Sequence, residues 1–131
     1  MRALDTNILV RFITADDSLQ TDRVRELFRT AEEHHELLFV SLPVTLELIW
    51  VLASTYDAPK ADIAEALQQL LGLPYLRFEQ EARIRQLLTA ATQGPVELGD
   101  LLIALSGKDH GCTTTLTFDR KALRSPLFTA L

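Results

Sequence analysis

The chain has 131 residues, 47% of them hydrophobic and 24% charged, which fits a single globular domain over residues 1–131 and excludes a disordered chain. Eighteen acidic and thirteen basic residues give a net charge of -5, which argues against broad binding to phosphate backbones without excluding a local basic surface for nucleic acid. One cysteine excludes an internal disulfide or a cysteine-based zinc site. The sequence shows no signal-peptide core and no apolar run of about 18 residues, so we expect a cytoplasmic protein with no membrane partner.

The N-terminal quarter of the chain predicts one short strand and two helices. An apolar segment before Asp5 is typical of a strand, and a helix is expected to begin near Asn7. Apolar residues then recur at helical spacing over about 18–33. Asp17, with Gln20 three residues later, resembles a capping box at the start of this second helix.

The next segment predicts a strand, two helices and a second strand. Residues 37–40 are continuously apolar, as in a short buried strand. Ser41 is expected to cap a helix over about 43–56, and the next helix covers about 59–71, between a proline and a glycine. A strand is expected at 75–78.

The C-terminal third completes the alternation of helices and strands. An amphipathic helix is expected around 84–91, and a nearly all-apolar helix at about 99–109 should be buried. Residues 113–118 are rich in β-branched and aromatic side chains and predict a strand. A helical turn at 121–124 and a weaker strand at 127–130 follow. Such alternation is typical of an α/β domain with a mainly parallel sheet flanked by helices.

Four acidic residues interrupt apolar stretches of this pattern: Asp5, Glu47, Asp100 and Asp119. Two of them follow predicted strands, and the other two lie near the starts of helices. In a parallel sheet all of these positions fall at the carboxyl edge, where open α/β sheets bind ligands. We therefore expect the four carboxylates to converge.

Converging carboxylates without nitrogen or sulfur partners predict a hard divalent cation. Mg²⁺ and Mn²⁺ prefer oxygen ligands, whereas Zn²⁺ sites usually include histidine or cysteine. Four carboxylates leave room for one ion, or for two ions about 3.5 to 4 Å apart as in phosphoryl-transfer enzymes. The leading chemistry is hydrolysis of a phosphodiester bond by metal-activated water.

Three of these acids also have an ordinary structural explanation. Asp5 could cap the helix that begins near Asn7. Asp100 could be a first-turn acid favoured by the helix dipole, and Asp119 a turn residue paired with Arg120 or Lys121. Glu47 has no such local role, because it lies within an apolar helical segment.

The sequence resembles the PIN-domain ribonucleases, particularly the VapC-type toxins of prokaryotic toxin–antitoxin pairs. The resemblance covers the whole chain and rests on four stretches that occur in the family's order. They are LDTNILVR at 4–11, LELIWVL at 46–52, GDLLIA at 99–104 and TFD at 117–119.

This resemblance implies a three-layer PIN-like domain with the strand order 3-2-1-4-5. It also implies metal-dependent cleavage of RNA, with Mg²⁺ or a substituting Mn²⁺ held by the four acids. Thr6, Asn7 and Thr117 would support the carboxylates or water. The chain would form a homodimer through its helices, and a cognate antitoxin would bind it and cover the acidic groove.

Basic and aromatic residues near these motifs have more than one interpretation. Arg11, Arg120 and Lys121 could bind the RNA backbone, or they could be solvated or ion-paired. Trp50 could stack on bases, but it is expected in the core or at an interface. Cys112 is expected to be a buried small side chain. The three histidines are expected at helix ends rather than in catalysis: His34, His35 and His110.

Three rival functions share parts of this pattern. A stand-alone PIN-type RNA-processing nuclease would share the same acids without an antitoxin. A phosphoacceptor signalling domain would also have an acidic Mg²⁺ pocket, but it needs a lysine at the end of its last strand that is not evident. A haloacid-dehalogenase-like phosphatase needs a second aspartate two residues after Asp5, where the chain has Asn7.

Overall fold

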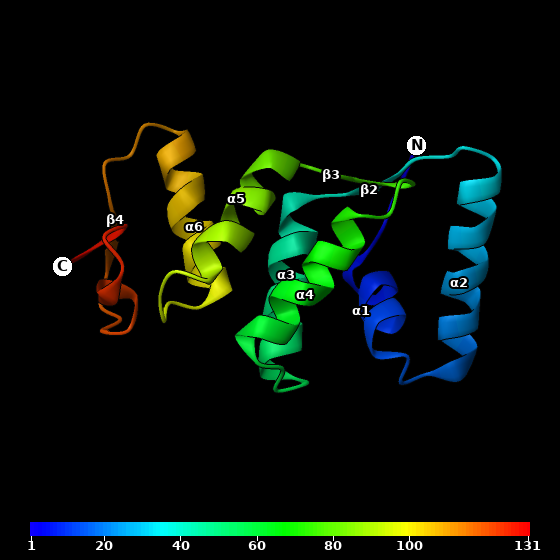
Figure 1. Cartoon of the computed structure of the whole chain (residues 1–131), viewed down its shortest axis with the longest axis horizontal. Coiled ribbons are helices and arrows are strands. Elements are labelled where there is room, and N and C mark those ends of the chain that lie inside the picture. Colours follow the sequence, from blue (N-terminus) through cyan, green and yellow to red (C-terminus); the bar gives the residue numbers. More distant parts are fainter. The chain divides into compact units, whose positions relative to one another are not determined.

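The computed structural model describes all residues from 1 to 131 and divides them into two compact units, Met1–Glu81 and Ala82–Leu131 (Figure 1). The helices are α1 (Thr6–Thr14), α2 (Ser18–Glu33), α3 (Leu42–Ser54), α4 (Lys60–Leu71), α5 (Glu81–Ala91), α6 (Leu98–Asp109) and the 3-10 turn η1 (Ala122–Arg124). The strands are β1 (Arg2–Ala3), β2 (Leu38–Val40), β3 (Leu76–Phe78), β4 (Thr115–Thr117) and β5 (Phe128–Ala130). None of the helices combines the length and the hydrophobicity that a membrane span requires.

Unit 1 is built on a three-stranded parallel sheet in the order β1-β2-β3. Leu38 of β2 pairs with Leu76 of β3, and both side chains are buried. The pairing of β1 with β2 continues one residue beyond β1, where the Leu4 amide donates to the Phe39 carbonyl at 2.9 Å. The main chain therefore stays extended up to Asp5.

Short-range caps begin the first three helices of unit 1. Asp5, Asp17 and Ser41 are the N-caps of α1, α2 and α3, and each side chain accepts a hydrogen bond from a backbone amide of the following turn. The predicted helix at 18–33 is confirmed. The capping box is only half formed, because the Gln20 side chain accepts from Arg11 at 2.7 Å instead of returning to Asp17.

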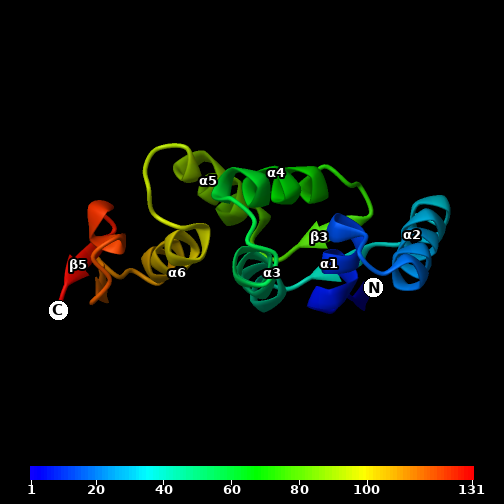
Figure 2. The ribbon, with the colours of Figure 1, turned by 90° about the horizontal axis from the view of Figure 1, so that it is seen from below.

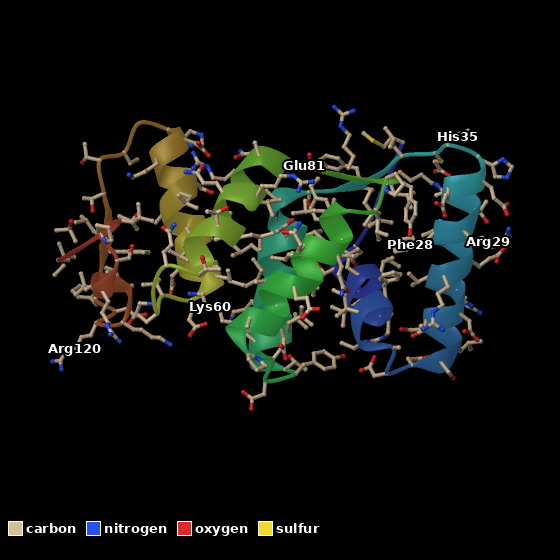
Figure 3. The ribbon with its side chains drawn as sticks, in the orientation of Figure 1. Phe28, Arg29, His35, Lys60, Glu81 and Arg120 are labelled. Atoms are coloured by element: carbon tan, nitrogen blue, oxygen red, sulfur yellow. The ribbon has the colours of Figure 1, made fainter.

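The core of unit 1 is apolar and partly aromatic. Helix α1 packs against α2 and α3, α3 packs against α4, and α4 packs against β3 (Figures 1 and 2). Phe28 packs between Phe12 and Tyr75, whose tilted rings have centroids 4.9 and 5.2 Å away. In Figure 3, Phe28 lies on the inner side of α2 and Arg29 on its outer side. Burying such a large side chain stabilises the fold by about 1.5 to 3 kcal/mol.

Unit 2 contains α5, α6 and a two-stranded parallel sheet of β4 and β5. Thr115 pairs with Phe128 and Thr117 with Ala130. The predicted burial of the apolar helix near 99–109 holds on one face: Leu101, Leu102, Ala104 and Leu105 are buried, whereas Ile103 is 51% exposed.

The α/β class with parallel strands is confirmed, and the strand order is divided between the units. The predicted order 3-2-1-4-5 is present as 3-2-1 in unit 1 and as 4-5 in unit 2. The two sheets are separate, and β1 and β4 each hydrogen-bond to one strand only. β1 and β4 are also short, so each contributes few ladder hydrogen bonds.

Two side chains differ from their predicted environment. Cys112 is exposed in the loop after α6, so the prediction of a buried cysteine is wrong. Trp50 is 66% exposed on α3, which excludes the core alternative and leaves an interface role as a prediction. Helical spacing alone does not separate these faces, because most neighbours of Trp50 are also apolar.

Candidate functional site

Asp5 lies at the carboxyl end of β1 and begins α1. Its Oδ1 accepts a hydrogen bond from the Thr6 amide at 2.7 Å, and its side chain is exposed. Thr6 itself is 3% exposed. The capping role considered from the sequence is thus present, and it fixes the carboxylate at the end of the strand while one oxygen faces no protein donor.

Glu47 lies in the second turn of α3, the helix that follows β2. Its neighbours Leu48 and Ile49 are buried, but the Glu47 side chain is exposed on the opposite side of the helix. Because β1 and β2 are parallel, the end of β1 and the start of α3 belong to the same edge of the unit 1 sheet. The structure therefore places Asp5 and the first turns of α3 at one edge.

Asn7 and Arg11 extend from this edge along α1. Asn7 is exposed in the first turn. The Arg11 guanidinium donates to Gln20 at 2.7 Å and to Asp16 at 3.2 Å, and the Tyr56 hydroxyl donates to the same Asp16 at 2.6 Å. Arg11 is thus ion-paired, one of the two alternatives that the sequence left open.

In unit 2, Asp119 follows β4 after one intervening residue. Its amide donates to Thr117 Oγ1 at 3.0 Å, and its Oδ1 accepts from the Lys121 amide at 2.9 Å. The Lys121 ammonium pairs with Glu97 Oε1 at 2.5 Å rather than with Asp119. Thr117 therefore supports the main chain of Asp119, and Asp119 is a turn residue whose second oxygen makes no hydrogen bond to the protein.

Asp100 lies in the first turn of α6 and is half-buried. Burial raises the pKa of Asp100, and the charges of Asp119 and Glu97 raise it further, while Lys121 opposes them. The start of α6 and the turn after β4 consequently form one acidic neighbourhood in unit 2. Two like charges near a partly desolvated carboxyl disfavour its ionised form until a cation is present.

Glu97 is the residue that sequence reasoning missed. It is the N-cap of α6, three residues before Asp100, and it contributes both a charge near Asp100 and the ion pair to Lys121. Its signal in the sequence was an acidic residue just before an apolar helix. Arg120 is exposed and makes no side-chain hydrogen bond or ion pair. The histidines lie at helix ends as predicted, with His34 and His110 as C-caps.

The donor chemistry fits a hard divalent cation. Every candidate ligand is a carboxylate, and Mg²⁺ and Mn²⁺ prefer such oxygens. Neither unit by itself gathers three or more His, Cys, Asp or Glu side chains at metal-binding spacing. In unit 2 the charges of Asp119 and Glu97 raise the pKa of Asp100, so these acids form an acidic neighbourhood and not a complete ligand cluster.

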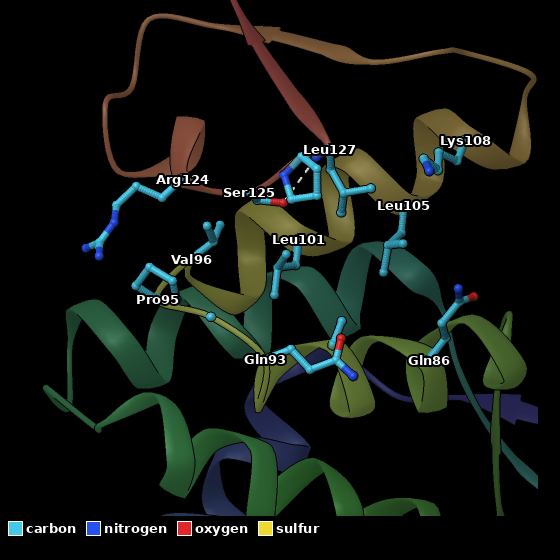
Figure 4. Close-up of a pocket in the computed structure, with 13 residues that line it drawn as sticks. Gln86, Gln93, Pro95, Val96, Leu101, Leu105, Lys108, Arg124, Ser125 and Leu127 are labelled. Carbon is cyan, nitrogen blue, oxygen red and sulfur yellow. Dashed lines mark hydrogen bonds between the residues drawn. The ribbon is translucent and has the colours of Figure 1, made fainter.

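Unit 2 contains a cavity of about 410 Å³ that is not lined by these acids (Figure 4). Leu101 and Leu105 of α6 contribute apolar walls, and Lys108 and Arg124 contribute positive charge. The loop beside it is closed by the Leu127 amide donating to Ser125 Oγ at 3.2 Å. None of the predicted site residues lines this cavity.

Comparison with known families gives one result that covers nearly the whole chain. The PIN domain family matches residues 2–126, a range that includes all four acids and most of both units. No curated protein matches the chain. PIN domains are generally metal-dependent nucleases and typically use divalent ions such as Mg²⁺. The chain belongs to the PIN domain family and is a nuclease of the PIN superfamily.

Proposed function

We propose that the protein is a Mg²⁺-dependent endoribonuclease in which Asp5, Glu47, Asp100 and Asp119 form the acidic set. The observation that carries this proposal is the family match, which covers most of both units and contains all four acids. We also infer that residues 1–131 act as one PIN domain. Mn²⁺ is expected to substitute for Mg²⁺, because both ions accept carboxylate oxygens.

The acids of unit 2 are suited to hold the cation. Burial and the neighbouring charges of Asp119 and Glu97 disfavour the ionised form of Asp100, and a bound cation removes that penalty. In unit 1, the Thr6 amide and the start of α1 hold Asp5 in a fixed orientation. When bound, the metal supplies water activation and charge stabilisation at the scissile phosphate.

Polar neighbours have supporting roles in this proposal. Thr117 holds the Asp119 main chain, because its hydroxyl accepts a hydrogen bond from the Asp119 amide. Thr6 and Asn7 occupy the first turn of α1 beside Asp5. Arg120 is an exposed cation beside Asp119 and is available for the RNA backbone, whereas Glu97 offsets the charge of Lys121.

We further propose that this nuclease is the toxin of a toxin–antitoxin pair in the cytoplasm, acting as a homodimer and inhibited by an antitoxin. The motif resemblance supports the toxin role. The exposed Trp50 on α3 supports an interface there, because an isolated exposed tryptophan is a common anchor of protein contacts. An adjacent reading frame for a small DNA-binding protein with a disordered tail would separate a toxin from a stand-alone nuclease.

The nature of the cleaved ends tests the chemistry. With Mg²⁺ or Mn²⁺, purified protein should cut single-stranded RNA and leave 5′-phosphate and 3′-hydroxyl ends, because water and not the ribose hydroxyl attacks. End-labelled products, treated with phosphatase or kinase before electrophoresis, report these ends. Products with a 2′,3′-cyclic phosphate, or full activity in EDTA, would contradict the proposal.

A further inference from the structure

A basic cavity lies in unit 1 between α1 and α2, which pack side by side (Figures 1 and 2). Its volume is about 440 Å³. Its lining residues include two arginines, Arg11 and Arg23, and no carboxylate, although the chain as a whole carries a net charge of -5. Asp16, outside the lining, pairs with Arg11 at 3.2 Å, so the unpaired positive charge of the cavity is that of Arg23, and it suits an anionic ligand.

The two arginines differ in how they are held. Arg11 donates a hydrogen bond from Nε to Gln20 at 2.7 Å. Its Nη1 donates to Asp16 at 3.2 Å and to the Tyr56 hydroxyl at 3.4 Å, while its Nη2 makes no hydrogen bond. Arg23 is exposed and makes no side-chain hydrogen bond or ion pair. The cavity thus combines a pre-oriented guanidinium with an unpaired one, and both have N–H groups left for phosphate oxygens.

The lining of the cavity reaches the first turn of α1, close in sequence to Asp5. Asn7, which lines the cavity, is two residues after Asp5 in the first turn of α1. Ile8 and Leu27 add half-buried apolar surface between Asn7 and the arginines. Apolar surface beside cations suits a single-stranded nucleic acid, because sugars and unstacked bases can lie on it while phosphates meet the arginines.

We propose that this cavity binds a backbone phosphate of single-stranded RNA next to the cleavage site, with Arg23 as a positioning residue. The inference rests on the proposed ribonuclease function and adds the path of the substrate along α1 and α2. Its occupant is RNA rather than a protein segment, because the lining holds two arginines and no carboxylate, and Arg23 is unpaired, so its charge favours a polyanion.

A matched pair of variants on α2 tests the proposal. Arg23→Gln removes the unpaired cation of the cavity, while Arg25→Gln removes another exposed and unpaired cation that does not line the cavity. Fluorescence anisotropy in EDTA, where RNA stays uncut, gives the Kd of a labelled single-stranded oligonucleotide at several salt concentrations. Arg23→Gln should weaken binding about three- to tenfold and reduce the slope of log K against log salt by about 0.7, while Arg25→Gln should change neither.

Cleavage kinetics provide the second readout. Arg23→Gln should raise KM by about the same factor and leave kcat within about twofold, because the contact is made to bound substrate as well as in the transition state. Equal melting temperatures of both variants would confirm that the fold is intact. Equal Kd values and salt slopes for the two variants would overturn the inference while leaving the nuclease proposal standing. Wild-type protein that neither binds nor cuts RNA would overturn the proposed function and the inference with it.

Discussion

The acids of unit 1 and those of unit 2 have different surroundings within their own units. Asp5 caps α1 and Glu47 stands on the exposed side of α3, so each has an ordinary solvent-facing position. Asp100 is half-buried and near the charges of Asp119 and Glu97. Unit 1 therefore holds its acids by local backbone geometry, whereas unit 2 holds Asp100 against an electrostatic penalty that a cation would relieve.

The largest expected effect tests whether this difference matters for activity. Asp5→Ala, Glu47→Ala and Asp100→Ala should each lower the cleavage rate at least about a hundredfold, because all three carboxylates are proposed to serve the same reaction. His110→Ala, a change at a helix end, should have little effect. Single-turnover rates measure this, and a loss restricted to Asp100→Ala would assign the chemistry to unit 2 alone.

A smaller effect concerns stabilisation by metal. At a metal concentration about 100 times its Kd, binding to the folded state should stabilise wild-type protein by about 2.7 kcal/mol. Asp100→Asn should gain much less, because it removes one charged ligand and keeps nearly the same shape. Thermal melts with and without Mn²⁺ measure the difference. An Asp100→Asn protein stabilised as strongly as wild type would show that Asp100 is not a ligand.

The smallest effect is the pH dependence of metal-free stability. The raised pKa of Asp100 means that its ionised form destabilises the fold near neutral pH, and that this penalty vanishes below the ordinary aspartate pKa of about 3.9. Asp100→Asn should therefore be as stable as wild type or more stable at pH 7, and the difference should shrink as the pH falls toward 4. Asp5→Asn should change little at either pH, because asparagine caps helices about as well as aspartate.

Denaturant unfolding in EDTA at both pH values measures these free energies. A large loss of stability in Asp100→Asn at pH 7 would make Asp100 a structural first-turn acid, the alternative considered from the sequence. A large loss in Asp5→Asn would show that the Asp5 charge, and not only its capping geometry, stabilises unit 1.

The order and approximate bounds of the helices and strands could be predicted because their signals are local. Apolar spacing located α2 and α4, and the caps Asp17 and Ser41 fixed where helices begin, since a cap acts within one turn. The motif containing Asp5 and the order of the four acids are also properties of the sequence alone, and they indicated the family. The PIN domain match over residues 2–126 confirms that family.

Other properties depend on contacts between residues far apart in the sequence, and only the tertiary structure decided them. Helical periodicity did not show that Glu47 and Trp50 lie on the exposed side of α3, because apolar residues occur on both the buried and the exposed side of this helix. The environment of Asp100 depends on a turn that lies well beyond α6 in the chain, where Asp119 and Lys121 follow β4. The division of the strands into two sheets depends on which edges hydrogen-bond, and strands as short as β1 carry too little side-chain pattern to specify that choice.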